Sequence, residues 1–175
     1  MEIESFVEWV ISLVSQYLYG GVFVAALLET IFPPIPSEAI FPLAGYVASQ
    51  NNLSFIHVIG LGIVGATGST IGALVIYLIA LKLGREGLAK YLKYVRITDD
   101  HLKKVDRWFS RHGEKVVLFG RMIPGIRELV SIPAGFLKMK MAKFLVFTFV
   151  GSCVWSISLT LVGYYFGVAS VNFFG

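Results

Sequence analysis

Four charged side chains lie where the sequence is otherwise strongly apolar: Glu29 and Glu38 in one stretch, Arg121 and Arg127 in another. A charge at the depth of a bilayer costs roughly 2.5–3.5 kcal/mol, so such a side chain faces water or an opposite charge. A carboxylate held away from water favours its neutral form and can carry a proton. An arginine keeps its charge and offers a planar fork that fits a phosphate group. We therefore predict proton binding at the two acids and phosphate binding at the two arginines.

Each pair of charges flanks a sharp break in the chain. Pro34 and Pro36 stand between the acids, and Pro124 with Gly125 between the arginines, where helices cannot continue. Each stretch is therefore predicted to enter the membrane, turn and leave on the same side, with its irregular backbone surrounded by protein or a wet cavity. The apolar arms around the breaks are too short to cross a bilayer alone; they are residues 21–28, 39–48, 116–120 and 129–137.

The composition is that of a membrane protein. Of the 175 residues, 56% are hydrophobic and 15% charged, whereas soluble domains are roughly 45–50% apolar and about 25% charged. Residues 58–81 and 144–168 carry no charge, and about 20 apolar residues suffice to cross a bilayer. We therefore expect an all-α, multi-pass protein of the cell membrane with two full crossings.

Charge is distributed unevenly along the chain. Residues 1–81 have a net charge of −5, the remainder +9, and ten of the 15 bases lie between Lys82 and Lys115. The bias of basic residues toward the inner side of membranes places residues 82–115 in the cytoplasm. Nucleic-acid binding is excluded as the explanation, because the basic half is interleaved with long apolar runs.

The two broken stretches are similar enough to suggest an internal repeat. At an offset of 90 residues Gly45 matches Gly135, and at an offset of 83 Gly68 matches Gly151. A single domain of residues 1–175 is therefore expected to contain two repeats, about 1–85 and 98–170. Each has an amphipathic helix, a hairpin and one crossing, so the second copy is inverted. The hairpins should then meet near the bilayer midplane, as in many transporters.

Several kinds of chemistry are not indicated. The chain has no HExxH motif, no GxSxG motif and no glycine-rich phosphate loop. Its three histidines are scattered, and Cys153 is the one cysteine. We therefore expect no metal site, no cofactor and no enzymatic activity.

One motif resembles the signature of the DedA family, also called the VTT or SNARE-associated Golgi protein family: Phe119-Gly-Arg121-Met-Ile-Pro124-Gly-Ile-Arg127, continued by Ser131-Ile-Pro133-Ala-Gly135. Glu29 with the proline-rich block that ends at Glu38 is similar to another landmark of that family. The resemblance covers about residues 20–168.

The resemblance implies a lipid transporter of the flippase or scramblase type. Bacterial members recycle undecaprenyl phosphate and depend on the proton motive force, and eukaryotic relatives move phospholipids. By match, Glu29 and Glu38 would couple protons while Arg121 and Arg127 bind the headgroup phosphate. The chain departs from the family pattern at Glu128, where a hydroxyl residue is common, and in its short span between the two acids.

Two other functions stay open from the residues themselves. In a proton-coupled exporter of small cationic solutes, the acids rather than the arginines would contact the substrate. In a non-transporting membrane scaffold, the four charges would form structural ion pairs, although buried pairs stabilise less well than apolar packing. A homo-oligomer is also left open as the state of assembly.

Overall fold

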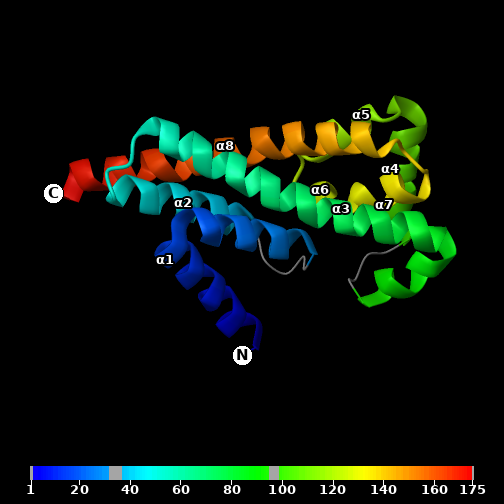
Figure 1. Ribbon diagram of the computed structural model, residues 1–175, viewed down its shortest axis with the longest axis horizontal. Coiled ribbons are helices and arrows are strands. Elements are labelled where there is room, and N and C mark those ends of the chain that lie inside the picture. Colours follow the sequence, from blue (N-terminus) through cyan, green and yellow to red (C-terminus); the bar gives the residue numbers. More distant parts are fainter. Residues whose placement is uncertain (1, 32–36, 95–98, 175) are drawn as a thin grey trace. The chain divides into compact units, whose positions relative to one another are not determined.

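The computed structural model describes residues 2–31, 37–94 and 99–174 (Figure 1), so the predicted turn residues Pro34 and Pro36 lie outside the described residues. Within these ranges the chain is helical, which confirms the predicted all-α class. The helices are α1 (Glu2–Ile31), α2 (Ser37–Gln50), α3 (Phe55–Tyr94), α4 (Asp99–His112), α5 (Lys115–Gly120), α6 (Ile126–Leu129), α7 (Ser131–Phe136) and α8 (Met141–Phe174).

The two predicted crossings lie inside the two longest helices. By length and composition, Phe55–Gly84 of α3 and Met141–Ala169 of α8 are long and apolar enough to span a membrane. The spanning part of α3 ends where Gly84 leaves helical geometry, with φ of 61° and ψ of −169°. Glycine reaches this positive φ without the steric cost that a Cβ atom imposes.

Helix α1 corrects one boundary that the sequence predicts. The expected arm of residues 21–28 is the end of a longer helix, and Ser12–Ile31 qualifies by length and composition as a third candidate span in the described residues. Helix α1 bends at Tyr17, where φ is −120° and ψ is 32°, and Figure 1 shows the bend. At the bend Gly21 lies directly against the backbone of Leu13, a close approach that a side chain would prevent.

The chain divides into two compact units, each containing one predicted hairpin. The first unit consists of Met1–Ser69 and Ser152–Gly175, and the second of Thr70–Gly151. Each unit therefore contains one part of α3 and one part of α8. The predicted repeats, about residues 1–85 and 98–170, instead assign each long helix to one copy and stay a prediction.

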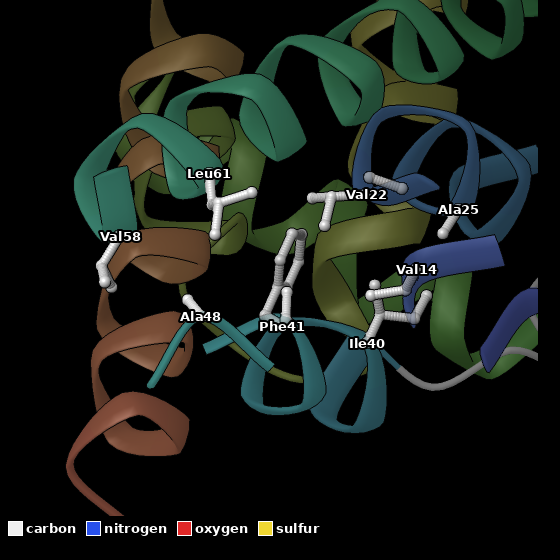
Figure 2. Packing of buried hydrophobic residues seen from close by; sticks show 10 residues of the cluster. Val14, Val22, Ala25, Ile40, Phe41, Ala48, Val58 and Leu61 are labelled. Atoms are coloured by element: carbon white, nitrogen blue, oxygen red, sulfur yellow. The ribbon is translucent and has the colours of Figure 1, made fainter. Parts of the chain in front are cut away.

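The core of the first unit lies between α1, α2, α3 and α8. Phe41 of α2 is fully buried and points toward Val22 of α1 and Leu61 of α3 in Figure 2. Leu159 of α8 packs against the same cluster. Ser156 also ties α8 to α3, because its Oγ donates a hydrogen bond to the carbonyl oxygen of Gly62 over 2.7 Å.

The core of the second unit forms around one aromatic pair. The rings of Tyr77 in α3 and Phe144 in α8 are stacked with their centroids 4.5 Å apart. The Tyr77 hydroxyl donates a hydrogen bond to the Met139 carbonyl oxygen over 2.5 Å. Phe109 of α4 and Val117 of α5 belong to the same buried cluster. This core supports the hairpin made by α5, α6 and α7.

Candidate functional site: the arginine hairpin

Arg121 lies at the turn of the second hairpin, inside protein. It follows α5 directly, and its backbone N–H donates to the Val117 carbonyl oxygen over 3.2 Å. Its side chain is only 1% exposed. The guanidinium donates a hydrogen bond from Nη2 to Ser131 Oγ over 2.7 Å, and Ser131 is fully buried. The arginine on the entering arm is thus attached to the first residue of the returning helix α7.

Helix α8 approaches Arg121 closely because it carries a glycine there. A methyl group at Gly151 would lie 2.7 Å from Arg121 Cβ and 2.8 Å from the Leu118 carbonyl oxygen. Thr148 lies one turn earlier on the same face of α8. Its side chain is fully buried, and its hydroxyl oxygen has no hydrogen-bond partner among the described residues. A buried hydroxyl of this kind is able to bind a polar group that enters the site.

Arg127 lies on the other side of the turn and is also buried, with 2% of its side chain exposed. It belongs to the short helix α6, which begins after Gly125. Gly125 has a φ of 75°, a left-handed conformation that favours glycine. Pro124 is exposed, and Glu128, beside Arg127 in α6, is half-buried. The Pro124–Gly125 turn predicted from the sequence therefore separates two buried guanidiniums in one unit.

The two predicted acids lie in the first unit and differ in environment. Glu29 stands in the last turn of α1 and is completely buried. Glu38 stands in the first turn of α2 and is exposed on the first unit. Of the two acids, Glu29 thus fits the expected membrane-buried carboxylate more closely. The expected meeting of acids and arginines stays a prediction.

Sequence reasoning missed three residues of the arginine hairpin's surroundings. Ser131 is part of the family-like motif, but no role was predicted for it. The sequence offers Gly151 only as the match of Gly68 in the predicted repeat, and Thr148 stands inside a long uncharged run. A signal was available for Thr148: it opens a series of buried hydroxyl residues spaced by four, which all fall on one face of α8. The series is Thr148, Ser152, Ser156 and Thr160.

Metal binding is not indicated by the described part of the chain. Within it, no group of three or more His, Cys, Asp or Glu side chains is placed to hold an ion. Arginine side chains are donors only, so the hairpin suits an anionic ligand better than a cation.

Long apolar helices and a helical hairpin with buried arginines define a multi-pass membrane protein of the cell membrane. More narrowly, the chain belongs to the VTT-domain family, the DedA family, whose model matches residues 35–165.

Relatives named as transporters are among the similar proteins. Undecaprenyl phosphate transporter A of Bacillus subtilis strain 168 is 36% identical over 89% of this chain and 79% of its own length. The protein of the same name from Staphylococcus aureus strain NCTC 8325 is 32% identical over 86% of this chain and 74% of its own length. An "alkaline phosphatase-like protein" of Lactococcus lactis strain IL1403 is 37% identical over 89% of this chain and 74% of its own length. No solved structure matches the chain.

Proposed function

We propose that this protein moves a polyprenyl-phosphate lipid between the leaflets of the cell membrane, and that Arg121 and Arg127 bind the phosphate. The observation that carries the proposal is the burial of both guanidiniums within one turn of a membrane hairpin, at 1% and 2% exposure. Two relatives with more than 30% identity are named undecaprenyl phosphate transporter A, which supports this class of substrate.

The chemistry of the site fits a phosphate on a lipid tail. A guanidinium has five N–H donors, and a phosphate accepts two of them side by side. Ser131 fixes one nitrogen of Arg121 from the returning helix, so the fork is oriented before the ligand arrives. Such preorganisation lowers the cost of binding. The apolar tail needs no protein site, because it stays in the surrounding lipid.

Proton linkage is assigned to Glu29. It is the one of the two predicted acids that is completely buried, and a carboxyl group is able to bind and release a proton. Proton binding of this kind can couple the conformation of a transporter to a proton gradient. Glu38, being exposed on the first unit, has the smaller part in this proposal.

An internal repeat is part of the proposal, and two pairs of contacts support it. Gly45 lies directly against the backbone of Thr160 in the first unit, and Gly135 against that of Tyr77 in the second. At offsets of 90 and 83, Gly45 corresponds to Gly135 and Tyr77 to Thr160. In a second pair of contacts the two glycines correspond in the same way.

That second pair joins α3 and α8 to the arms of the hairpins. Gly68 meets the backbone of Phe23 in the first unit, and Gly151 meets that of Leu118 in the second. Gly68 and Gly151 correspond at the offset of 83. Hairpins that pack alike on equivalent halves of two long helices are what repeats of one ancestral unit would produce, and such repeats are typical of transporters.

The test is leaflet-to-leaflet movement of a fluorescent polyprenyl phosphate in vesicles that contain the purified protein. A membrane-impermeant reductant reports the fraction of dye in the outer leaflet. The proposal expects R121A and R127A to remain inserted and lose transport, and R121K to retain part of it, because lysine keeps the charge but lacks the fork. Lys82, an exposed base of the second unit, supplies the control variant K82A, which should transport normally.

Three results would overturn the proposal. Wild-type transport by both arginine variants would remove the phosphate-binding role. Export of a small cation that is spared or improved in R127A would favour the exporter. Release of inorganic phosphate from the lipid, measured in the same vesicles, would favour an enzyme of the kind that the Lactococcus relative's name suggests.

A further inference from the structure

A second group of bases lies outside the arginine hairpin, on the exposed side of α4. Lys103, Lys104, Arg107 and Arg111 are all exposed. At 100° per residue they fall within an arc of about 100° around the helix. Phe109, which is 8% exposed, projects from the opposite side of α4 into the core of the second unit. Helix α4 is therefore fixed through its apolar face and presents its bases outward.

The connection between α7 and α8 adds to this group. Lys138 and Lys140 are exposed and flank the buried Met139, which belongs to the same core cluster as Phe109. Helix α4 also packs against α5 and α7, as Figure 1 shows for these neighbouring helices. We refer to the six exposed bases of α4 and of this connection together as the basic surface: Lys103, Lys104, Arg107, Arg111, Lys138 and Lys140.

Glu114, which stands two residues after α4, pairs with a base that is not one of these six. Glu114 Oε2 lies 2.6 Å from Lys143 Nζ in a salt bridge that joins the start of α5 to the start of α8. That pair neutralises Lys143, which is not counted among the six bases. Bases grouped on one exposed face of an amphipathic helix attract anionic lipid headgroups, and this attraction acts within a Debye length of about 8–10 Å.

Helix α4, which carries four of these bases, packs against α5 of the arginine hairpin. Helix α5 begins at Lys115 and ends beside Arg121. Its six residues rise about 9 Å at 1.5 Å per residue. A headgroup held at the outer end of α5 would therefore lie about 9 Å from Arg121 as measured along the helix axis.

We infer that this basic surface binds the phosphate headgroups of anionic bilayer lipids and concentrates the lipid substrate beside Arg121. The inference that anionic lipid binds at the basic surface depends only on the exposed bases. The loading role, in contrast, rests on the proposed function, so the two are tested by separate measurements.

Binding can be followed with Trp108 of α4, which is 37% exposed at the edge of the basic surface. The other two tryptophans, Trp9 and Trp155, are replaced by phenylalanine. The protein is placed in phosphatidylcholine vesicles with a minor fraction of phosphatidylglycerol, and either lipid carries brominated tails that quench nearby tryptophan. Enrichment is the quenching by brominated phosphatidylglycerol relative to that by the same fraction of brominated phosphatidylcholine.

The expected result is several-fold enrichment that decreases as salt rises. The variant K103Q/K104Q/R107Q/R111Q should lower the enrichment to about one. A matched variant, K103R/K104R/R107K/R111K, keeps every charge and should keep the enrichment. Thermal unfolding of each variant verifies its fold. Equal quenching by the two lipids in the parent protein overturns the inference, as does enrichment unchanged by the four glutamines. Inorganic phosphate that abolishes the enrichment at constant ionic strength would indicate a free-phosphate site instead.

The loading role is measured as the fraction of polyprenyl phosphate at which transport is half-maximal. We expect the four-glutamine variant to raise this fraction several-fold, whereas R121A lowers the maximal rate itself. An unchanged half-maximal fraction, with lipid enrichment lost, would overturn loading. If R121A and R127A both transport normally, the proposed function fails while the enrichment at Trp108 still decides the binding inference.

Discussion

Arg121 and Ser131 join the two arms of the second hairpin through one buried hydrogen bond, with Nη2 donating to Oγ over 2.7 Å. Both side chains are at most 1% exposed, so water does not replace this bond when it is lost. Arg121 closes the entering arm, and Ser131 begins α7 of the returning arm. The orientation of the guanidinium therefore depends on both arms, which makes Ser131 a positioning residue for the proposed phosphate site.

The substitution S131A should reduce transport without preventing membrane insertion. The substitution removes Ser131 Oγ, which accepts the hydrogen bond from Arg121 Nη2. Loss of such a bond to a buried charged group costs about 1–3 kcal/mol of folding free energy. We expect a lower thermal unfolding temperature and a slower movement of the fluorescent polyprenyl phosphate. The matched variant S131T keeps the hydroxyl and should retain more transport than S131A.

A double variant separates positioning from general packing. If Ser131 acts through Arg121, transport by R121A/S131A should equal that by R121A, because the positioned group is already gone. Independent losses from the two substitutions would contradict the positioning role.

The close approach of α8 to Arg121 predicts that G151A destabilises the protein. The added methyl group would lie 2.7 Å from Arg121 Cβ, and overpacking of this kind costs about 1–3 kcal/mol. The control is G60A, whose methyl group would find its nearest neighbour, an atom of Tyr19, at 3.5 Å. We expect G60A to unfold at or above the parent temperature, since alanine favours a helix over glycine by roughly 0.5–1 kcal/mol. Equal unfolding temperatures for the two variants would contradict the close packing.

The proposed repeat extends this prediction to Gly68, which corresponds to Gly151. G68A should lower the unfolding temperature about as much as G151A, because its methyl group would clash with the backbone oxygen of Phe23. G68A leaves the arginine hairpin intact, so any loss of transport beyond the loss of folded protein is expected in G151A alone.

The arginines and their turn could be predicted from sequence because charges, prolines and glycines are conspicuous in an apolar chain. Arg121, Arg127 and Gly125 all lie where the break was expected, and the φ of 75° at Gly125 agrees with a turn. The four-residue spacing on α8 indicates a shared face for Thr148, but the sequence does not indicate that Ser131 or Thr148 belongs to the surroundings of the site. A serine or threonine is common inside membrane helices, and only the packing of α7 and α8 shows which of them are buried beside it.

The bend of α1 was missed for a related reason. The predicted arm of residues 21–28 begins at a pair of glycines, Gly20 and Gly21, and glycine weakens helices. In the fold, the helix continues through both glycines and bends at Tyr17, and Gly21 allows the two parts to touch at Leu13. Local propensity gives the weak point, whereas tertiary contact decides whether the helix ends or bends there.

Membrane topology can be tested through the basic surface. The excess of Lys and Arg in residues 82–115 and 138–143 predicts that both segments are cytoplasmic. Single cysteines at Lys104 and Lys140, both exposed, are introduced into a C153S background. A membrane-impermeant maleimide should label neither cysteine in intact cells and both in inverted vesicles. Labelling of either position from outside would reverse the predicted orientation.

The proton-coupling proposal predicts that E29Q transports lipid without responding to a pH gradient. Glutamine has nearly the shape of the protonated glutamate and cannot ionise, so the fully buried site at Glu29 should keep its packing. In the parent protein, a gradient imposed across the vesicle membrane should accelerate movement of polyprenyl phosphate. In E29Q the rate should be the same with and without the gradient, because no proton binds or leaves at this position.

The matched variant E38Q removes the second predicted acid, which is exposed on the first unit. We expect it to keep more of the gradient response than E29Q. Thermal unfolding distinguishes coupling from structure, since a purely structural carboxylate at Glu29 would change the unfolding temperature while the gradient response persists. A normal gradient response in E29Q, E38Q and the double variant would remove both acids from proton coupling. Lipid movement through phosphate binding at Arg121 and Arg127 would then be driven by the difference in lipid concentration between the leaflets alone.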